Sequence, residues 1–194
     1  MGGIGNLCVA PANSQQEIKS PCWGRLAYSA DLGRPAAPSL ASGPALFLEA
    51  QNPNKRIAWS VSLDPDDQAE LERLGVDGHK LTRRGNRFLL SCNVDSIRKT
   101  QLHRTVLHEI GHWVDWLQKV VRPSQGNMDS LESLKDLYFS RPKQEREAFA
   151  HHYATTIQER LVFSGKMPFA RIISPQLIAE DGLRMQDFIL PNDS

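Results

Sequence analysis

Residues 107–115 read LHEIGHWVD, and this stretch carries the strongest signal in the chain. On an α-helix, His108 and His112 lie one turn apart on the same face, so both imidazoles can reach one Zn²⁺ at about 2.0 to 2.1 Å. Glu109 then lies next to a water on that metal and can take its proton. The stretch therefore predicts a helix that presents two zinc ligands and a general base.

The surrounding residues predict that this helix runs over about 96–121 and is ended by Pro123. The two histidines and Asp115 share one side of the helical wheel, and apolar side chains occupy the opposite side. A glycine inside a helix costs about 1 kcal/mol relative to alanine, so Gly111 predicts that another segment, or the substrate, approaches closely there. The alternative is a structural helix with two satisfied histidines.

Zinc needs a further protein ligand, and the sequence offers Glu147, Asp115 and His151. Asp115 lies on the same helix as the histidine pair, and one straight helix does not surround a tetrahedral ion. Glu147 shares a helix face with small apolar residues, where an unpaired carboxylate is unfavourable unless a metal neutralises it. We therefore favour Glu147 as the ligand, with His151 as a partner of the ligands or a substitute for one of them.

Two other charged residues receive roles from the same reasoning. Asp115 is expected to orient a ligand histidine, with a carboxylate on the helix surface as the alternative. Arg146 lies off the face that carries Glu147 and is expected to be a solvated charge.

The chain divides into residues 1–44, which are rich in Pro, Gly and Ser, and a single domain over 45–194. The first part is expected to be an arm or loop. In the second part, short apolar runs bounded by turn residues predict strands, and longer periodic runs predict helices. Because the strands precede most of the helices, the sequence predicts an α+β fold. The strands are expected at 45–50, 56–61 and 87–92, with a hairpin of the first two as one option, and further helices at 64–75, 129–139 and 142–163.

The strand at 87–92 is predicted to be the edge strand next to the cleft. An exposed edge binds an extended peptide by main-chain hydrogen bonds. The residues expected to pair with substrate are Phe88, Leu89, Leu90, Ser91 and Cys92.

LHEIGHWVD, followed by EAFAHHYA at 147–154, resembles the gluzincin metallopeptidases. The likeness is to the catalytic domain of anthrax lethal factor, to the Pro-Pro endopeptidases and, more distantly, to the ImmA/IrrE-type peptidases. It covers about residues 87–165 and implies a zincin-like fold, with a small N-terminal sheet, an active-site helix and a helical C-terminal part. It implies His108, His112 and Glu147 as ligands and Glu109 as the base. The family usually has a second Glu at the position of His151.

The resemblance also implies a tyrosine that stabilises the oxyanion and precedes the ligand Glu in sequence. Tyr138 is the nearest candidate, two residues further from Glu147 than the family spacing.

Composition excludes several classes of protein. The formal net charge of +1 gives no overall attraction to nucleic acid. No apolar run reaches about 18 residues, so no membrane span is predicted. The N-terminal stretch MGGIGNLCVAPANS lacks a basic start and a sustained apolar region, and the three cysteines are too scattered for a disulfide framework. A cytoplasmic location is expected, with export that needs no signal peptide as the alternative.

The sequence thus predicts a zinc-dependent endopeptidase that binds one Zn²⁺ per chain and acts on a protein or peptide. One alternative is a non-catalytic binding or regulatory module stabilised by zinc. Another is a hydrolase with the same site that acts on a non-peptide amide. No oligomeric state is predicted.

Overall fold

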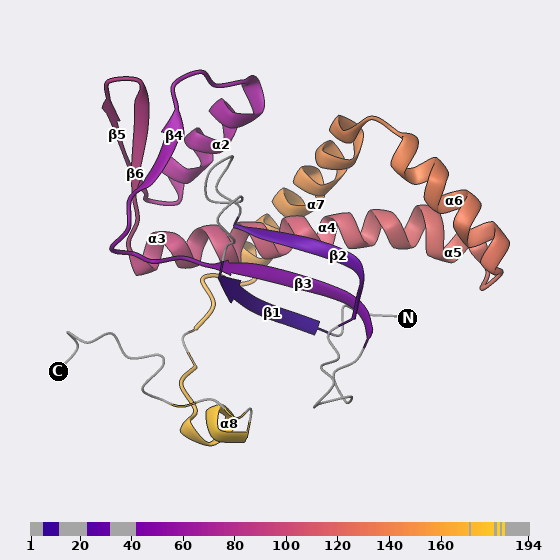
Figure 1. Ribbon diagram of the computed structural model, residues 1–194. Helices are drawn as coiled ribbons and strands as arrows, with labels where there is room; N and C mark the ends of the chain where they lie inside the picture. The colour runs from indigo at the N-terminus through magenta and orange to yellow at the C-terminus, as the bar shows by residue number, and fades with distance from the viewer. Residues whose placement is uncertain are drawn as a thin grey trace.

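The part of the chain that the structure describes is an α+β fold, as predicted (Figure 1). The computed structural model describes residues 6–11, 23–31, 42–170, 172–180, 182 and 184. The strands are β1 (Asn6–Pro11), β2 (Gly24–Asp31), β3 (Ser42–Ala50), β4 (Ile57–Ser60), β5 (Lys80–Arg84) and β6 (Arg87–Ser91). The helices are α2 (Pro65–Val76), α3 (Val94–Arg98), α4 (Val106–Trp116), α5 (Arg122–Ser124), α6 (Met128–Ser140), α7 (Lys143–Phe163) and α8 (Pro175–Glu180), with π-helical segments η1 (Lys99–Thr105) and η2 (Leu117–Val121).

The first sheet corrects the expectation for residues 1–44. Its strand order is β1-β3-β2, with β1 parallel and β2 antiparallel to β3. The described parts of 1–44 therefore include strands of a sheet, and the prediction of an arm or loop is wrong for them. The Pro-, Gly- and Ser-rich composition of residues 1–44, above all of 33–44, masks this eight-residue strand. The loop expected at 33–41 lies outside the described residues.

The second sheet is antiparallel, with the order β4-β6-β5. The predicted strands at 56–61 and 87–92 correspond to β4 and β6, while the strand at 45–50 belongs to β3. Because β3 and β4 lie in different sheets, the expected hairpin does not form. The connecting helix α2 begins as predicted, with Pro65 at its first position and Asp64 accepting a hydrogen bond from the Asp67 backbone N–H at 2.8 Å.

The long helix around the histidine motif is continuous from α3 to α5, with wider π-helical turns on both sides of α4 (Figure 1). Asn93 and Ser96 form a capping box at its start. The helix runs through Pro123 to Ser124, slightly further than predicted, and ends where Gln125 adopts a left-handed φ of 49°.

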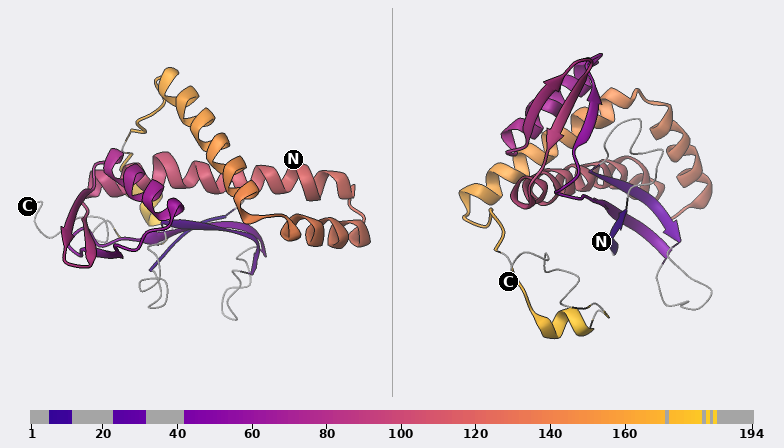
Figure 2. Two further views of the ribbon diagram at one scale, coloured as in Figure 1. Left: turned by 90° about the horizontal axis from the view of Figure 1, so that it is seen from above. Right: turned by 60° about the vertical axis from the view of Figure 1, so that its left-hand side comes forward.

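The two helices predicted after the motif, at 129–139 and 142–163, correspond to α6 and α7. α6 begins with Asn127 accepting a hydrogen bond from the Ser130 backbone N–H, and α7 follows after a short turn. Both β2 and α7 pack against α4, so the histidine helix lies between a strand and a second helix (Figures 1 and 2). None of the helices among the described residues is both long and apolar enough to cross a membrane.

Gly24 allows β2 to approach the helix closely. A Cβ atom at this position would lie 2.7 Å from Cγ2 of Thr105 and 2.9 Å from the carbonyl oxygen of Phe47. Further along β2, Leu26 and Tyr28 pack against the buried cluster of Trp113, Trp116 and Tyr138. These contacts fix β2 next to the turn that carries the histidines.

Candidate metal centre

The structure brings His108, His112 and Glu147 to one point between α4 and α7. The two imidazole Nε2 atoms are 3.1 Å apart. Oε2 of Glu147 lies 3.3 Å from Nε2 of His108 and 3.6 Å from Nε2 of His112. The contacts with the two histidines hold the pKa of Glu147 well below its usual range. Three potential ligand atoms from two helices therefore face a common centre.

The spacing of these atoms fits a single zinc ion. Donors arranged tetrahedrally at about 2.1 Å from one Zn²⁺ lie about 3.4 Å from each other. The three distances in the structure, between 3.1 and 3.6 Å, bracket that value. Two imidazoles and one carboxylate are also a ligand set that zinc accepts, with a position left for water or substrate. The residues present fit the metal that the sequence predicts.

Gly111 sets the short distance between the two helices. A Cβ atom at this position would lie 2.9 Å from Cα and 3.0 Å from the carbonyl oxygen of Ala150, and 3.2 Å from Cβ of Tyr153. Ala150 itself is completely buried. The close approach that Gly111 predicts is therefore made by α7, and it allows Glu147, one turn before Ala150, to reach the histidines on α4.

Gly111→Ala is expected to separate α4 from α7, because the new methyl group would meet backbone atoms that cannot rotate away. Overpacking costs up to about 3 kcal/mol, against a gain of about 1 kcal/mol from replacing a helical glycine, and a contact of 2.9 Å with the Ala150 backbone is relieved only by moving a helix. We expect a lower free energy of unfolding in urea and weaker zinc binding. Gly75→Ala in α2 is the matched control, since nothing lies within 4 Å of its Cβ position. Equal effects of the two variants would contradict this account.

His151 lies beside the three residues, also on α7. Its ring centroid is 4.4 Å from that of His108. Surrounding protein, followed by the charge on His108, lowers the pKa of His151 to about 4. Donor atoms of His108, Glu147 and His151 all lie within 4.8 Å of one another, which is looser than the group containing His112. The group with His112 has the spacing that zinc requires, and His151 lies beside it on α7.

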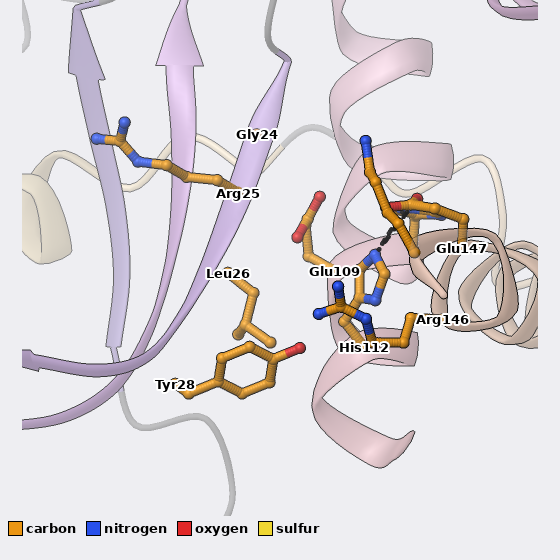
Figure 3. A pocket seen from close by; sticks show the side chains of 10 residues that line it. Gly24, Arg25, Leu26, Tyr28, Glu109, His112, Arg146 and Glu147 are labelled. Atoms are coloured by element: carbon orange, nitrogen blue, oxygen red, sulfur yellow. Dashed lines mark hydrogen bonds and ion pairs between the residues drawn. The ribbon is translucent and has the colours of Figure 1, made fainter. Parts of the chain in front are cut away.

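Glu109 lies between α4 and β2, and its residue is 8% exposed. The backbone N–H of Leu26 donates a hydrogen bond to its carboxylate, which ties β2 to the helix. Burial is the main influence on the acid and raises the pKa of Glu109, although the neighbouring histidines act against this. A carboxylate with a raised pKa is a stronger base than an exposed one. Figure 3 shows the Glu109 side chain directed toward β2.

These residues line a cleft of about 330 Å³ between β2, α4 and the start of α7 (Figure 3). Side chains alternate along β2, so Leu26 and Tyr28 point toward α4 while Arg25 points away. Arg25 instead lies 3.7 Å from Glu49 and over the ring of Phe47. The lining residues are Gly24, Arg25, Leu26, Tyr28, His108, Glu109, His112, Lys143, Arg146 and Glu147.

The predicted substrate strand is wrong. Phe88, Leu89, Leu90 and Ser91 belong to β6, which pairs with β4 on one side and with β5 on the other. Its backbone groups are already used, and Cys92 packs against the core that includes Leu90. Among the described strands, β2 is instead the edge strand next to the cleft.

Tyr138 does not line the cleft, so the structure does not support the catalytic role expected for it. It is 2% exposed and packs edge-on against Trp116. Its hydroxyl lies 3.4 Å from the hydroxyl of Tyr28, and that second tyrosine does line the cleft. Sequence reasoning missed Tyr28 because it lies within the stretch interpreted as an arm. The alternation of Leu26 and Tyr28 with smaller or polar residues was a signal that could have identified the strand.

Asp115 is fully buried, and its ion pairs are with Lys119 and with Arg141, the latter at 3.8 Å. Its contacts therefore anchor two cations, which corrects the expectation that it orients a ligand histidine. Among the described residues, Nδ1 of His108 is buried without a hydrogen-bond partner.

Arg146, expected to be solvated, is instead half-buried at the cleft.

Models of known protein families, curated proteins and solved structures give no match to this chain.

Proposed function

We propose that this protein is a zinc-dependent endopeptidase with a zincin-like, gluzincin-type site. The observation that carries the proposal is the convergence of His108, His112 and Glu147 within 3.6 Å of one another, next to the buried carboxylate of Glu109. These three residues would hold a Zn²⁺ ion, which would act as a Lewis acid toward a carbonyl group and make water acidic near neutral pH. The likeness of the motif to gluzincins supports the same reading.

Glu109 is the proton carrier in this proposal. Its carboxylate accepts one proton from the attacking water, whose oxygen forms the new bond to the scissile carbonyl carbon. It then gives that proton to the leaving amine when the carbon–nitrogen bond breaks. The hydrogen bond from Leu26 holds the carboxylate in place, and burial keeps its pKa raised. Both features favour a group that transfers a proton in both directions.

Tyr28 is positioned to stabilise the negative charge that develops on the carbonyl oxygen. Its ring is packed between Trp116, at 4.6 Å between centroids, and Tyr138. Burial is the main cause that raises the pKa of Tyr28 above its ordinary value, so the hydroxyl keeps its proton at neutral pH. A protonated, fixed hydroxyl is a suitable donor to an oxyanion. Tyr28 would thus replace Tyr138 in the role that the resemblance implied.

The edge of β2 provides a place for an extended substrate. An added strand would run along the cleft beside α4, with main-chain hydrogen bonds to β2 giving affinity. The Leu26 backbone N–H donates to Glu109, which indicates that this part of the β2 backbone faces the site. A peptide bound there would place a backbone carbonyl near the histidines.

The second candidate is a non-catalytic module stabilised by zinc. His151 favours it, because structural zinc sites have four protein ligands and a donor atom of His151 lies within 4.8 Å of those of His108 and Glu147. The enzyme reading remains the stronger one, because the buried carboxylate of Glu109 in the cleft has no use in a structural site.

The proposed function is tested with zinc-loaded protein and an unbiased peptide library, with cleavage read by mass spectrometry. We expect new peptide termini that are absent after treatment with a chelator and that return when zinc is added. Cleavage that persists without metal would contradict the proposal. If the zinc-loaded protein cleaves no peptide but hydrolyses small non-peptide amides, the substrate belongs to another class.

A further inference from the structure

Two cationic side chains from the first turn of α7 line the cleft. Lys143 is exposed, and Arg146 is half-buried immediately before the ligand Glu147. Figure 3 shows the Arg146 guanidinium beside His112 and directed toward the hydroxyl of Tyr28. Both cations therefore lie where a substrate would pass the metal centre.

The other arginines around the cleft are neutralised, whereas Arg146 is not. Arg25 points away from α4 and lies 3.7 Å from the carboxylate of Glu49, which belongs to β3. Arg141 lies 2.8 Å from Glu145 and 3.8 Å from Asp115. Among the described residues, neither Arg146 nor Lys143 has a carboxylate within ion-pair distance. Two positive charges at the cleft therefore lack a counter-charge.

Arg146 is held in place by aromatic rings instead of by an acid. Its guanidinium carbon lies 5.3 Å from the centroid of Phe139 and 5.6 Å from that of Tyr138. Its Nε atom is buried and makes no hydrogen bond within the described part of the chain. Contact with a ring face fixes the plane of a guanidinium but leaves its charge and its two terminal NH2 groups available. An arginine held in this way is prepared to bind an anion.

The charge balance of the cleft indicates the sign of the ligand. The +2 charge of a bound zinc ion would be offset by Glu109 and Glu147, which leaves Lys143 and Arg146 as the excess charge. The anion of an unmodified peptide is the carboxylate, which a planar guanidinium binds with two parallel hydrogen bonds.

We propose that Lys143 and Arg146 bind a substrate carboxylate within one or two residues of the cleaved bond. The carboxylate comes from an Asp or Glu side chain or from the C-terminus of the peptide. This inference rests on the proposed peptidase function and names its substrate class. The excess positive charge also attracts acidic segments from solution.

The first arm of the test measures cleavage. Zinc-loaded protein is given two peptide pools that are identical except that Asp and Glu in one are Asn and Gln in the other. Each pool is made with a free C-terminal acid and with a C-terminal amide, so that the two sources of carboxylate are distinguished. We expect the acidic pool, or the pool with free termini, to be cleaved on the order of tenfold faster, the range for a charge-assisted hydrogen bond.

The second arm measures binding without turnover, by equilibrium dialysis of the same pools against zinc-loaded Glu109→Gln protein. The variants Lys143→Gln and Arg146→Gln are added to this background, with Arg146→Lys as the variant that keeps the charge. Arg160→Gln is the matched control, because it removes a charge from the exposed last part of α7. We expect Arg146→Gln to reduce the preference for the carboxylate pool to about twofold or less, Arg146→Lys to restore part of it, and Arg160→Gln to leave it unchanged.

The two arms separate the two hypotheses. The carboxylate site would be overturned, even if the protein is a peptidase, by equal binding of all pools, with or without Asp and Glu and with or without a free C-terminus. It would also be overturned by a preference for carboxylate that survives the combined Lys143→Gln and Arg146→Gln changes. A preference in binding that depends on Arg146, without cleavage of any pool by the wild-type protein, would support the carboxylate site and reject the peptidase.

Discussion

Glu109→Gln is expected to keep its zinc and to lose a factor of at least about 10² in the rate of peptide hydrolysis, the lower range for general acid–base catalysis. Glutamine has nearly the same shape as glutamate, but its amide does not accept a proton from water. The Leu26 backbone N–H can still donate to the amide oxygen, so the fold next to β2 is preserved. The rate and the zinc content are measured on the same preparation.

The control for this variant is Glu159→Gln, which removes an exposed carboxylate from the distal part of α7. It is expected to change neither rate nor zinc content. Turnover near that of the wild-type protein by Glu109→Gln would contradict the role of Glu109 as the base. Loss of zinc from that variant would instead show that Glu109 is needed to hold the metal.

Glu147→Ala is expected to weaken zinc binding more than any other change outside the two histidines of the motif. The carboxylate contacts both imidazoles at 3.3 and 3.6 Å, and alanine would leave them without the third donor. His151→Ala is the comparison from the same helix. A residue that only supports the ligands costs about 10- to 100-fold in affinity when removed. Zinc affinities of both variants are measured by competition with a chromogenic chelator.

Asp115→Ala completes the series, because the sequence also offered Asp115 as a ligand. Its removal would leave Lys119 and Arg141 without their buried counter-charge, so stability is expected to fall while zinc affinity changes little. If His151→Ala strips the metal while Glu147→Ala retains it tightly, the assignment of Glu147 is wrong.

The sequence predicted the parts of the site that depend on local geometry. The spacing of His108 and His112 fixes their relative position once the segment is helical. Glu147 could also be found, because a carboxylate on an apolar helix face needs a partner. Gly111 predicted the contact between the helices, because a glycine inside a helix is unfavourable unless it has a packing role.

The parts that depend on strand pairing could not be read in the same way. Alternation in 87–92 identified a strand but not whether it lies at the edge or the centre of a sheet, because pairing partners are distant in sequence. β2 lies among Pro-, Gly- and Ser-rich stretches, so neither the edge strand nor Tyr28 was recognised. Arg146 was interpreted as solvated because its helical position showed only that it lies off the Glu147 face, not that aromatic rings of α6 cover it.

The most direct test of the account is the zinc content and zinc affinity of protein prepared without chelator. Inductively coupled plasma mass spectrometry should find about one zinc per chain, as expected for a single site with three protein ligands. His108→Ala and His112→Ala should each lose the metal while remaining folded by circular dichroism. Wild-type protein that contains no zinc and takes up none on addition, or histidine variants that bind it as tightly as the wild-type protein, would contradict the account.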